Sequence, residues 1–523
     1  METGLTRMWT VLSSSSKGRL MVAAKDIPIG TVVLVEFPTV YVPYQIVGYS
    51  GTVGFDSSYS RAEESMLAAG TAATGTTFKG YAIILAARLV TASQRNASIR
   101  ASIASLCRKS SDSSVSDFSD VIASAHIVRR LLLGSGVDCS LEGCVETLQK
   151  LECNAFTVVV RDLSSTVGIG LYTTAAAMNH SCDPNCCQTF DLSSSSKLFI
   201  RAIRNIQKGE EITISYIDVG KPTWWRKNEL FLSYGFSCSC PRCGTLDPSD
   251  SYNCPVLNCH GVLGVIESDC YLSWKSSHVT CYSDLKMKQM IRSELELPFP
   301  IGDILLQSSS STTNSSSSSS SSLSSPSSSS PTPSPLTTSP SKQNRTEGLN
   351  SSTKLRFLCN RCGNESGGDD IMKLICTINK KIKRIKIKKI NKNNVDSCVA
   401  ESQDCIQSLL RLVKPSHYCM IDLYRDYVLE DLLLEGKFEL YVRTVRSSNY
   451  LLNLKTKYPV NHPFPAIQAV MYAKSLLHIY QSNDDVVEVR ACLLRALKVL
   501  TITHGEDASL VFDIKDMLSG ISS

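Results

Sequence analysis

The chain has 523 residues, of which 43% are hydrophobic, with 21 cysteines and a formal net charge of +6. This length allows roughly three domains, and the composition excludes a collagen-like, a wholly disordered or a small disulfide-stapled protein. Residues 1–16 lack the apolar run of a secretory signal, and no stretch approaches the ~20 apolar residues of a membrane span, so we expect an intracellular protein, cytoplasmic or nuclear, whose thiols stay reduced.

The first 300 residues change from predicted strands to helices and back. Residues 17–44 read as strands around a turn at 28–30, and residues 45–150 look largely helical. Short β-like runs follow at 156–160, 198–203 and 211–216. Residues 217–300 carry several cysteines and look irregular, so no regular element is expected there.

The second half of the chain begins with a low-complexity tract. Residues 308–341 are almost wholly Ser, Thr and Pro, and they cannot bury enough apolar area to offset the entropy of ordering the chain. Beyond Lys392 the sequence is helical to its end, with apolar residues recurring on one face between Val486 and Leu500. Several such helices joined by short turns predict stacked helical hairpins.

The positive charge is concentrated in one segment. Residues 380–392 hold eight Lys or Arg and no acid, and without them the net charge falls from +6 to −2. The run fits a nuclear localisation or acid-binding patch and, equally well, a solvated loop. The overall charge therefore does not indicate a nucleic-acid partner for the folded domains.

Three cysteines lie within six residues at Cys238, Cys240 and Cys243. In a reducing compartment this spacing indicates a structural zinc site, which needs a fourth ligand from elsewhere in the chain. The nearby candidates are Cys182, Cys186 and Cys187.

A second set of cysteines forms two pairs on either side of the Ser-rich tract, Cys254 with Cys259 and Cys359 with Cys362. Each pair resembles half of a zinc ribbon, and a long insertion between the halves costs little closure entropy. Cys270, Cys281 and His260 are alternative ligands, and unrelated cysteines are the competing interpretation.

Two polar motifs lie within residues 179–216. Asn179-His180-Ser181-Cys182-Asp183-Pro184-Asn185 is followed by Gly209-Glu210-Glu211-Ile212-Thr213-Ile214-Ser215-Tyr216. Neither motif offers a nucleophile elbow or a phosphate-binding loop, so hydrolase chemistry is not indicated. On chemistry alone His180 is more easily a structural histidine than a base.

Together with Tyr234-Gly235-Phe236 and the three following cysteines, these motifs resemble the SET domain of protein-lysine methyltransferases, and more narrowly its SMYD (SET and MYND) branch. Residues 153–157 and 167–172 match the same branch. Near the C-terminus, Tyr458-Pro459, Asn461-His462-Pro463 and Thr503-His504-Gly505 resemble its helical domain.

The resemblance implies an α+β fold: a SET-domain β-fold with a pseudo-knot, a zinc-bearing post-SET segment and a C-terminal all-α, tetratricopeptide-like domain. The expected organisation is N-terminal SET strands over 1–44, a helical insert in place of MYND over 45–150, a SET core over 151–237, a post-SET cysteine-rich region over 238–300, a Ser-rich disordered insert over 301–353, the second half of the zinc ribbon and the basic run over 354–403, and helices over 404–523.

The sequence departs from the family pattern in two places. No cysteine lies before Cys107, so the two-zinc MYND finger is not expected, nor are the contacts attributed to it. The cofactor loop of the family usually reads Gly-x-Gly, whereas Leu20 here stands in the position of the second glycine. Because leucine does not adopt positive φ cheaply, this loop could differ in shape or bind the cofactor less tightly.

The resemblance further implies S-adenosylmethionine as methyl donor and protein lysine side chains, histone or non-histone, as acceptors. The cofactor contacts it assigns are Lys17, Gly18, Arg19, Asn154, Asn179, His180, Tyr216 and Phe236. Tyr216 is the expected catalytic tyrosine and Tyr234 a wall of the lysine channel. Cys182 becomes the expected fourth zinc ligand beside Cys238, Cys240 and Cys243.

Two other functions compete with the enzyme. A catalytically weak SET scaffold, with protein partners on its helical domain, is supported by Leu20 and the lost MYND finger. A zinc-dependent nucleic-acid binder is supported by the ribbon cysteines and the 380–392 run, but it is disfavoured because the rest of the chain is slightly acidic. No membrane partner is expected.

Overall fold

The computed structural model describes most of the chain in separate stretches, which are residues 7–44, 63, 68, 77–108, 115–160, 166–192, 196–245, 252–265, 356–367, 370, 373–374, 376–378, 380 and 395–522. The Ser-rich tract, the basic run beyond Lys380, and the alternative ligands Cys270 and Cys281 lie outside these residues.

Four strands open the described chain: β1 (Trp9–Ser14), β2 (Gly18–Ala23), β3 (Val32–Glu36) and β4 (Val40–Pro43). The prediction of strands over 17–44 is confirmed, whereas β1 was not predicted. β1 and β2 form an antiparallel hairpin in which Trp9 pairs with Ala23 and Ser14 with Gly18. The indole nitrogen of Trp9 donates to the Val33 carbonyl at 3.2 Å, which ties the hairpin to β3.

The remaining strands of this half are short. They are β5 (Ala155–Val159), β6 (Thr166–Leu171), β7 (Asn179–His180), β8 (Cys186–Asp191), β9 (Lys197–Ala202) and β10 (Thr213–Ile214). They form sheets in the orders β3-β9-β8, β4-β6-β5 and β10-β7. Strands β2, β3, β5, β8 and β9 contribute to a core around Met21, Tyr172 and Met178, all of which are fully buried. The buried side chains of β4 and β6 instead pack with the helix α2 (Thr77–Arg95) in a second core. The expected β-like runs are confirmed, although the run over 211–216 contains only the two residues of β10.

Within the described part of the region predicted to be helical lie α2 (Thr77–Arg95), α3 (Ala97–Ala104), α4 (Val115–Gly134) and α5 (Leu141–Asn154). Residues 80–90 of α2 are mostly buried on every side, because α4 and α5 pack against α2 together with β4. Ser140 caps α5 by accepting a hydrogen bond from the Gly143 N–H. This helix ends at Asn154, directly before β5.

The expectation of irregular structure over 217–300 is wrong for residues 223–234. Thr223–Tyr234 form α6, which buries Thr223, Arg226 and Leu230 at helical spacing. The helix follows Pro222 and ends at Gly235, whose φ of 77° closes the last turn. The apolar pattern does not predict this helix, because its buried face contains a threonine and an arginine and only a few aliphatic residues.

A small antiparallel sheet joins segments from either side of the Ser-rich tract. Its strands are β11 (Tyr252–Asn253), β12 (Val262–Val265), β13 (Arg356–Cys359) and β14 (Glu365–Gly367), in that order. Leu263 pairs with Cys359 across β12 and β13, although almost a hundred residues separate them in the sequence. The sheet therefore has the arrangement expected of a ribbon interrupted by an insertion.

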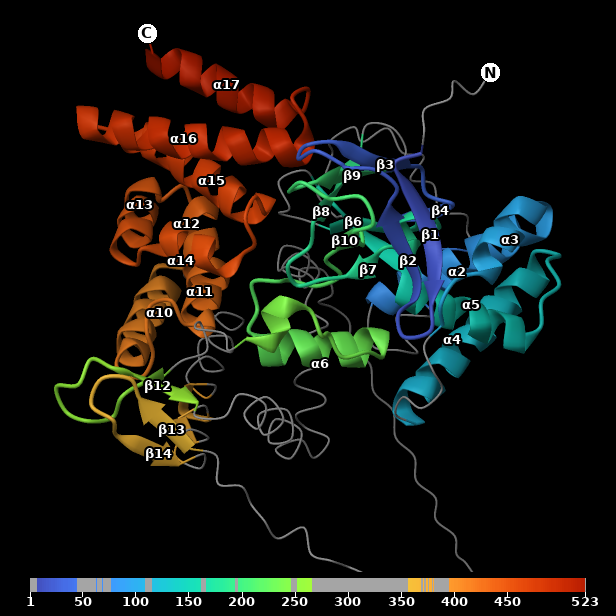
Figure 1. Ribbon diagram of the computed structural model, residues 1–523, viewed down its shortest axis with the longest axis horizontal. Helices are drawn as coiled ribbons and strands as arrows, with labels where there is room; N and C mark the ends of the chain where they lie inside the picture. Colours follow the sequence, from blue (N-terminus) through green and yellow to red (C-terminus); the bar gives the residue numbers. More distant parts are fainter. Residues whose placement is uncertain are drawn as a thin grey trace, which may run out of the picture. The chain divides into compact units, whose positions relative to one another are not determined.

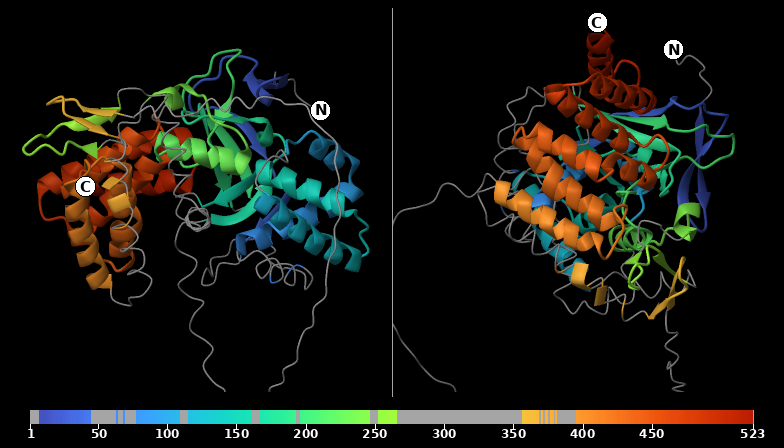
Figure 2. Two further views of the ribbon diagram at one scale, coloured as in Figure 1. Left: turned by 90° about the horizontal axis from the view of Figure 1, so that it is seen from below. Right: turned by 90° about the vertical axis from the view of Figure 1, so that its left-hand side faces the viewer.

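The rest of the chain is helical, as predicted (Figures 1 and 2). The helices are α10 (Val395–Leu410), α11 (Tyr418–Tyr424), the π-helical turn η4 (Arg425–Leu429), α12 (Glu430–Leu434), α13 (Phe438–Ser447), α14 (Tyr450–Lys457), α15 (Pro463–Ile479), α16 (Asn483–His504) and α17 (Ser509–Ser522). Successive helices pack side by side, α15 on α16 and α16 on α17. Among the described residues, no helix combines the length and apolarity needed to cross a membrane.

His462, the N-cap residue of α15, should make the stability of the fold sensitive to acid. Burial lowers the pKa of His462 to about 4, with Asp218 opposing and Arg242 reinforcing the shift. Because the folded pKa lies below the ordinary value near 6.5, neutral His462 stabilises the fold fully above about pH 6.5, and this contribution is lost as the pH falls towards 4. We expect a loss of about 2 kcal/mol in the free energy of unfolding over this range.

Urea titrations at several pH values check the acid sensitivity. His462→Gln retains a polar side chain at the helix N-terminus and should flatten the pH profile between 6.5 and 4, whereas substitution of the half-exposed His478 should not. A wild-type profile without a slope in this window would contradict the assignment.

Candidate functional site

The two polar motifs meet at the short parallel pairing of β7 with β10. Asn179 pairs with Thr213 and His180 with Ile214. Asn185, which is 1% exposed, links the two motifs by further hydrogen bonds. Its Oδ1 accepts from the Thr213 N–H at 2.8 Å, and its Nδ2 donates to the Glu211 carbonyl at 2.8 Å. This crossing of two loops is the arrangement that the predicted pseudo-knot requires.

Glu211 connects the second motif to the expected cofactor loop. Its carboxylate accepts from Asn179 Nδ2 at 2.9 Å and from Lys17 Nζ at 2.6 Å. The Lys17 side chain is 58% exposed, so this ion pair adds little stability and mainly sets the position of the loop. Asn179 and Lys17 therefore share one acid, to which the resemblance assigns no role.

A segment just after α3 covers the expected cofactor loop. Arg19 donates from Nη1 to Ser105 Oγ at 3.3 Å and from Nη2 to the Ala176 carbonyl at 3.4 Å. Asn154, which is buried, donates from Nδ2 to the Cys107 carbonyl at 2.8 Å. The segment 105–107 thus joins Arg19 to Asn154, and the sequence offered no motif for this contact.

One buried polar atom of this loop lacks a partner. Arg19 Nε is buried and makes no hydrogen bond within the described residues. An unsatisfied buried N–H is costly, so this atom fits a site that an anionic or acceptor group of a ligand completes. The carboxylate of S-adenosylmethionine has that chemistry.

Leu20 does not distort the cofactor loop. It lies within β2, pairs in register with Leu12, and is not among the residues with positive φ in the described chain. The turn needs positive φ only at Gly18, where φ is 68°. Leu20 therefore gives no reason for an altered loop shape, because the strand begins before that position, whereas the expected effect on cofactor affinity stays a prediction.

Four aromatic rings gather where β7, β10 and the end of α6 meet. The Tyr216 ring centroid lies 4.9 Å from that of Tyr234, 5.4 Å from His180 and 6.5 Å from Phe236, which it meets edge to face. Burial raises the pKa of Tyr216 and of Tyr234, so both remain neutral phenols at physiological pH. The hydroxyl of Tyr216 donates to the Met178 carbonyl at 2.6 Å.

His180 links this aromatic group to the first cysteine cluster. Its Nδ1 accepts from the Tyr216 N–H at 3.0 Å, and its Nε2 lies 3.2 Å from Cys182 Sγ. Both ring nitrogens are therefore engaged by the protein. This geometry makes His180 a structural histidine that fixes the Tyr216 backbone.

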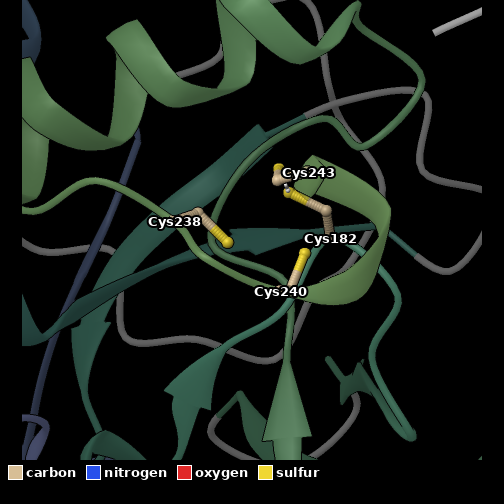
Figure 3. A group of neighbouring side chains, drawn as sticks. All are labelled: Cys182, Cys238, Cys240 and Cys243. Atoms are coloured by element: carbon tan, nitrogen blue, oxygen red, sulfur yellow. Dashed lines mark hydrogen bonds between the residues drawn. The ribbon is translucent and has the colours of Figure 1, made fainter. Parts of the chain in front are cut away.

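Figure 3 shows the side chains of Cys182, Cys238, Cys240 and Cys243 converging on one point. Their four sulfur atoms lie within 4.8 Å of one another, and Cys182 and Cys243 are 3.4 Å apart. Zn–S bonds of about 2.3 Å in a tetrahedron place sulfurs about 3.8 Å apart, so the four thiols fit a zinc ion. Hydrogen bonds among the four thiols lower the pKa of Cys238 and of Cys240, which favours their thiolate forms, whereas the pKa values of Cys182 and Cys243 are raised.

Arg226 provides a second observation in favour of zinc. Its side chain is fully buried, and Nη2 lies 3.8 Å from Cys243 Sγ and 2.9 Å from Thr223 Oγ1. A buried guanidinium is costly unless negative charge lies nearby, and a zinc ion with four thiolates carries net negative charge. Arg226 therefore suits a metal-bound cluster better than four neutral thiols.

The second cysteine cluster is also assembled. Cys254 Sγ lies 3.6 Å from Cys362 Sγ, and Cys259 Sγ lies 3.7 Å from Cys359 Sγ. All four sulfurs are within 4.8 Å of one another. Backbone N–H groups of Cys362 and Arg361 lower the pKa of Cys359 to about 6. The alternative ligand His260 is not part of the group, and Cys186 and Cys187 belong to neither cluster.

Comparison with known proteins matches residues 18–217 to the SET domain family. Residues 18–217 are a SET domain. The human histone-lysine N-methyltransferase SMYD3 is 41% identical to the chain over 102 residues, which cover 20% of this chain and 23% of that protein. The human N-lysine methyltransferase SMYD2 is 37% identical over 106 residues, covering 20% of this chain and 24% of that protein.

A plant relative extends the similarity. The histone-lysine N-methyltransferase ASHR1 of Arabidopsis thaliana is 34% identical over 148 residues, which cover 27% of this chain and 30% of that protein. The chain thus spans less than a third of the length of these curated relatives. The SMYD resemblance inferred from the motifs is confirmed for the SET domain.

Proposed function

We propose that this chain is a protein-lysine N-methyltransferase that uses S-adenosylmethionine. The observation that carries the proposal is the partly buried group of Tyr216, Tyr234 and Phe236, together with a cofactor loop whose Arg19 Nε makes no hydrogen bond within the described residues. The matched SET domain and the names of the relatives support the same activity.

The residues near the loop could hold the cofactor by its polar ends. Arg19 Nε would meet the carboxylate, and Lys17 lies beside the same turn. Asn154 uses its amide hydrogens on the carbonyls of Cys107 and Lys150, so a ligand ammonium would meet its Oδ1. Phe236 would pack on the adenine ring, and Asn179 and His180 would contribute main-chain groups. When bound, the cofactor supplies a methyl group on a positively charged sulfur.

The rest of the chemistry requires an uncharged lysine amine in line with that methyl group. Tyr216 and Tyr234 are partly buried and neutral, so a lysine side chain between them would lose much of its hydration and its pKa would fall. The Tyr216 hydroxyl and the Met178 carbonyl, 2.6 Å apart, would orient the amine and disperse positive charge. No acid–base pair is needed, which agrees with the engaged nitrogens of His180.

Label transfer tests the activity. Purified protein is incubated with methyl-labelled S-adenosylmethionine and a panel of histones and cytosolic proteins, with Tyr216→Phe in parallel. We expect label on proteins from at least one of the two groups, and the labelled substrates then distinguish histone from non-histone targets. Absence of both label and calorimetric cofactor binding would contradict the proposal, whereas binding without transfer would favour a SET scaffold.

The loop glycine gives a prediction about cofactor affinity. Gly18→Ala places a side chain at a φ of 68°, and it should weaken S-adenosylmethionine binding about tenfold, because alanine at positive φ costs roughly 1 kcal/mol or more. Leu20→Gly is the matched control at the other loop position and should change affinity less than twofold. Calorimetric titration measures both, and tighter binding by Leu20→Gly would show that leucine does impair the loop.

A further inference from the structure

The segment that joins α14 to α15 contacts the SET domain and the first cysteine cluster at once. It runs from Lys457 to His462 and contains the Tyr-Pro and Asn-His-Pro motifs, to which the proposed methyl transfer assigns no role. Asn461 Nδ2 donates to the Ile203 carbonyl at 2.9 Å. Arg242, between the ligands Cys240 and Cys243, donates to the Cys182 carbonyl at 2.9 Å and to the Lys457 carbonyl.

Tyr458 makes the contact nearest to Tyr216. Its hydroxyl donates to Asp218 Oδ1 at 2.9 Å, two residues along the chain from the tyrosine expected to be catalytic. A Cβ atom on Gly220 would lie 2.4 Å from the Tyr458 ring, so only glycine permits this approach. The Tyr458 ring therefore lies directly against the turn that follows β10.

Ion pairs join two charged residues of the same turn, Asp218 and Lys221, to Asp422 and Arg425. Asp218 Oδ2 lies 3.6 Å from Arg425, and Asp422 binds Lys221 at 2.6 Å and Arg425 at 3.3 Å. These side chains are only 16–25% exposed, so the ion pairs are screened less than surface pairs. Burial raises the pKa of Asp422, but Lys221 and Arg425 outweigh it and lower the pKa to about 2.

We infer that Tyr458 and Asp218 are positioning residues of the methyl-transfer site. Residues 217–222 connect Tyr216 to α6, which carries Tyr234 at its end, so fixing this turn helps to set the separation of the two tyrosines. Arg242 fixes the cysteine loop to the same segment. The helical domain thereby becomes part of the catalytic geometry, and this inference rests on the proposed function.

Tyr458→Phe removes only the hydroxyl and keeps the ring against Gly220. We expect the kcat of methyl transfer to fall about tenfold, while the Kd of S-adenosylmethionine changes less than twofold. Asp218→Ala removes the acceptor of the Tyr458 hydroxyl and also the contact with Arg425, so its kcat should fall at least as far. The double variant should be no slower than Asp218→Ala alone, because the hydrogen bond that Tyr458→Phe removes is already lost. Tyr441→Phe, a buried tyrosine of α13, is the matched control and should leave kcat unchanged.

Hydrogen exchange provides a readout that does not depend on activity. The Tyr216 N–H, bonded to His180, should exchange faster in Tyr458→Phe than in the wild type, while amides of α2 stay unchanged. An inactive wild-type protein with this exchange difference would refute the proposed function alone. Unchanged kcat and unchanged exchange at Tyr216, or losses that add in the double variant, would overturn the positioning role.

Discussion

Replacing Tyr216 with phenylalanine should lower the kcat of methyl transfer at least about 100-fold, which is the scale of losing one aligned hydrogen-bonding group at a reacting centre. The variant loses the hydroxyl that contacts the Met178 carbonyl and keeps the ring between His180 and Tyr234. Cofactor affinity should change by less than threefold. Steady-state rates of label transfer and calorimetric titration of S-adenosylmethionine measure the two effects.

A stability control separates chemistry from folding. Removing one buried hydrogen bond costs about 1 kcal/mol, so Tyr216→Phe should remain folded. Tyr441→Phe serves as the reference for loss of a buried tyrosine hydroxyl far from the cofactor loop. If Tyr216→Phe transfers methyl groups at the wild-type rate, Tyr216 has no catalytic role and the proposed mechanism fails.

Replacing Cys243 with serine should have the largest effect on stability. The side chain is fully buried in the first cysteine cluster, where serine cannot replace a thiolate ligand and Arg226 would lose much of its compensating charge. We expect bound zinc to fall from about two to about one per chain, with a loss of several kcal/mol in the free energy of unfolding. Metal analysis and thermal unfolding, with and without chelator, provide the measurements.

Cys187→Ser is the matched control for the zinc prediction. Cys187 is also buried and lies close to Cys182 in the sequence, but it belongs to neither cluster. Its substitution should leave the zinc content at about two per chain. Purified wild-type protein without zinc, and with a melting temperature insensitive to chelators, would show that the clusters are not metal sites.

Spacing and motif predicted the parts of the site that lie on continuous segments. Cys238, Cys240 and Cys243 are close in the sequence, so their convergence could be read directly, whereas the choice of Cys182 over Cys186 and Cys187 came from the family resemblance. The two cysteine pairs on either side of the Ser-rich tract come together in one cluster, as the sequence predicted. The roles of Tyr216, Tyr234 and the cofactor contacts remain predictions that the experiments above address.

Packing between distant segments could not be predicted in the same way. Glu211 and Asn185 belong to the two polar motifs, but the motifs do not reveal which partners they contact, and the segment 105–107 has no local pattern at all. Arg226 was hidden because a buried arginine makes sense only beside the thiolates. Leu20 shows the reverse case, in which a correct rule about positive φ was applied to a position that the structure places inside a strand.

The central claim is that this SET domain transfers methyl groups to lysine side chains of proteins. Incubation with S-adenosylmethionine carrying a deuterated methyl group, followed by mass spectrometry of the acceptor proteins, tests it most directly. The account predicts deuterated methyl groups on lysine ε-amines, absent when Tyr216→Phe replaces the wild type. Deuterium on other residue types only, or none on any protein despite measured cofactor binding, would contradict it.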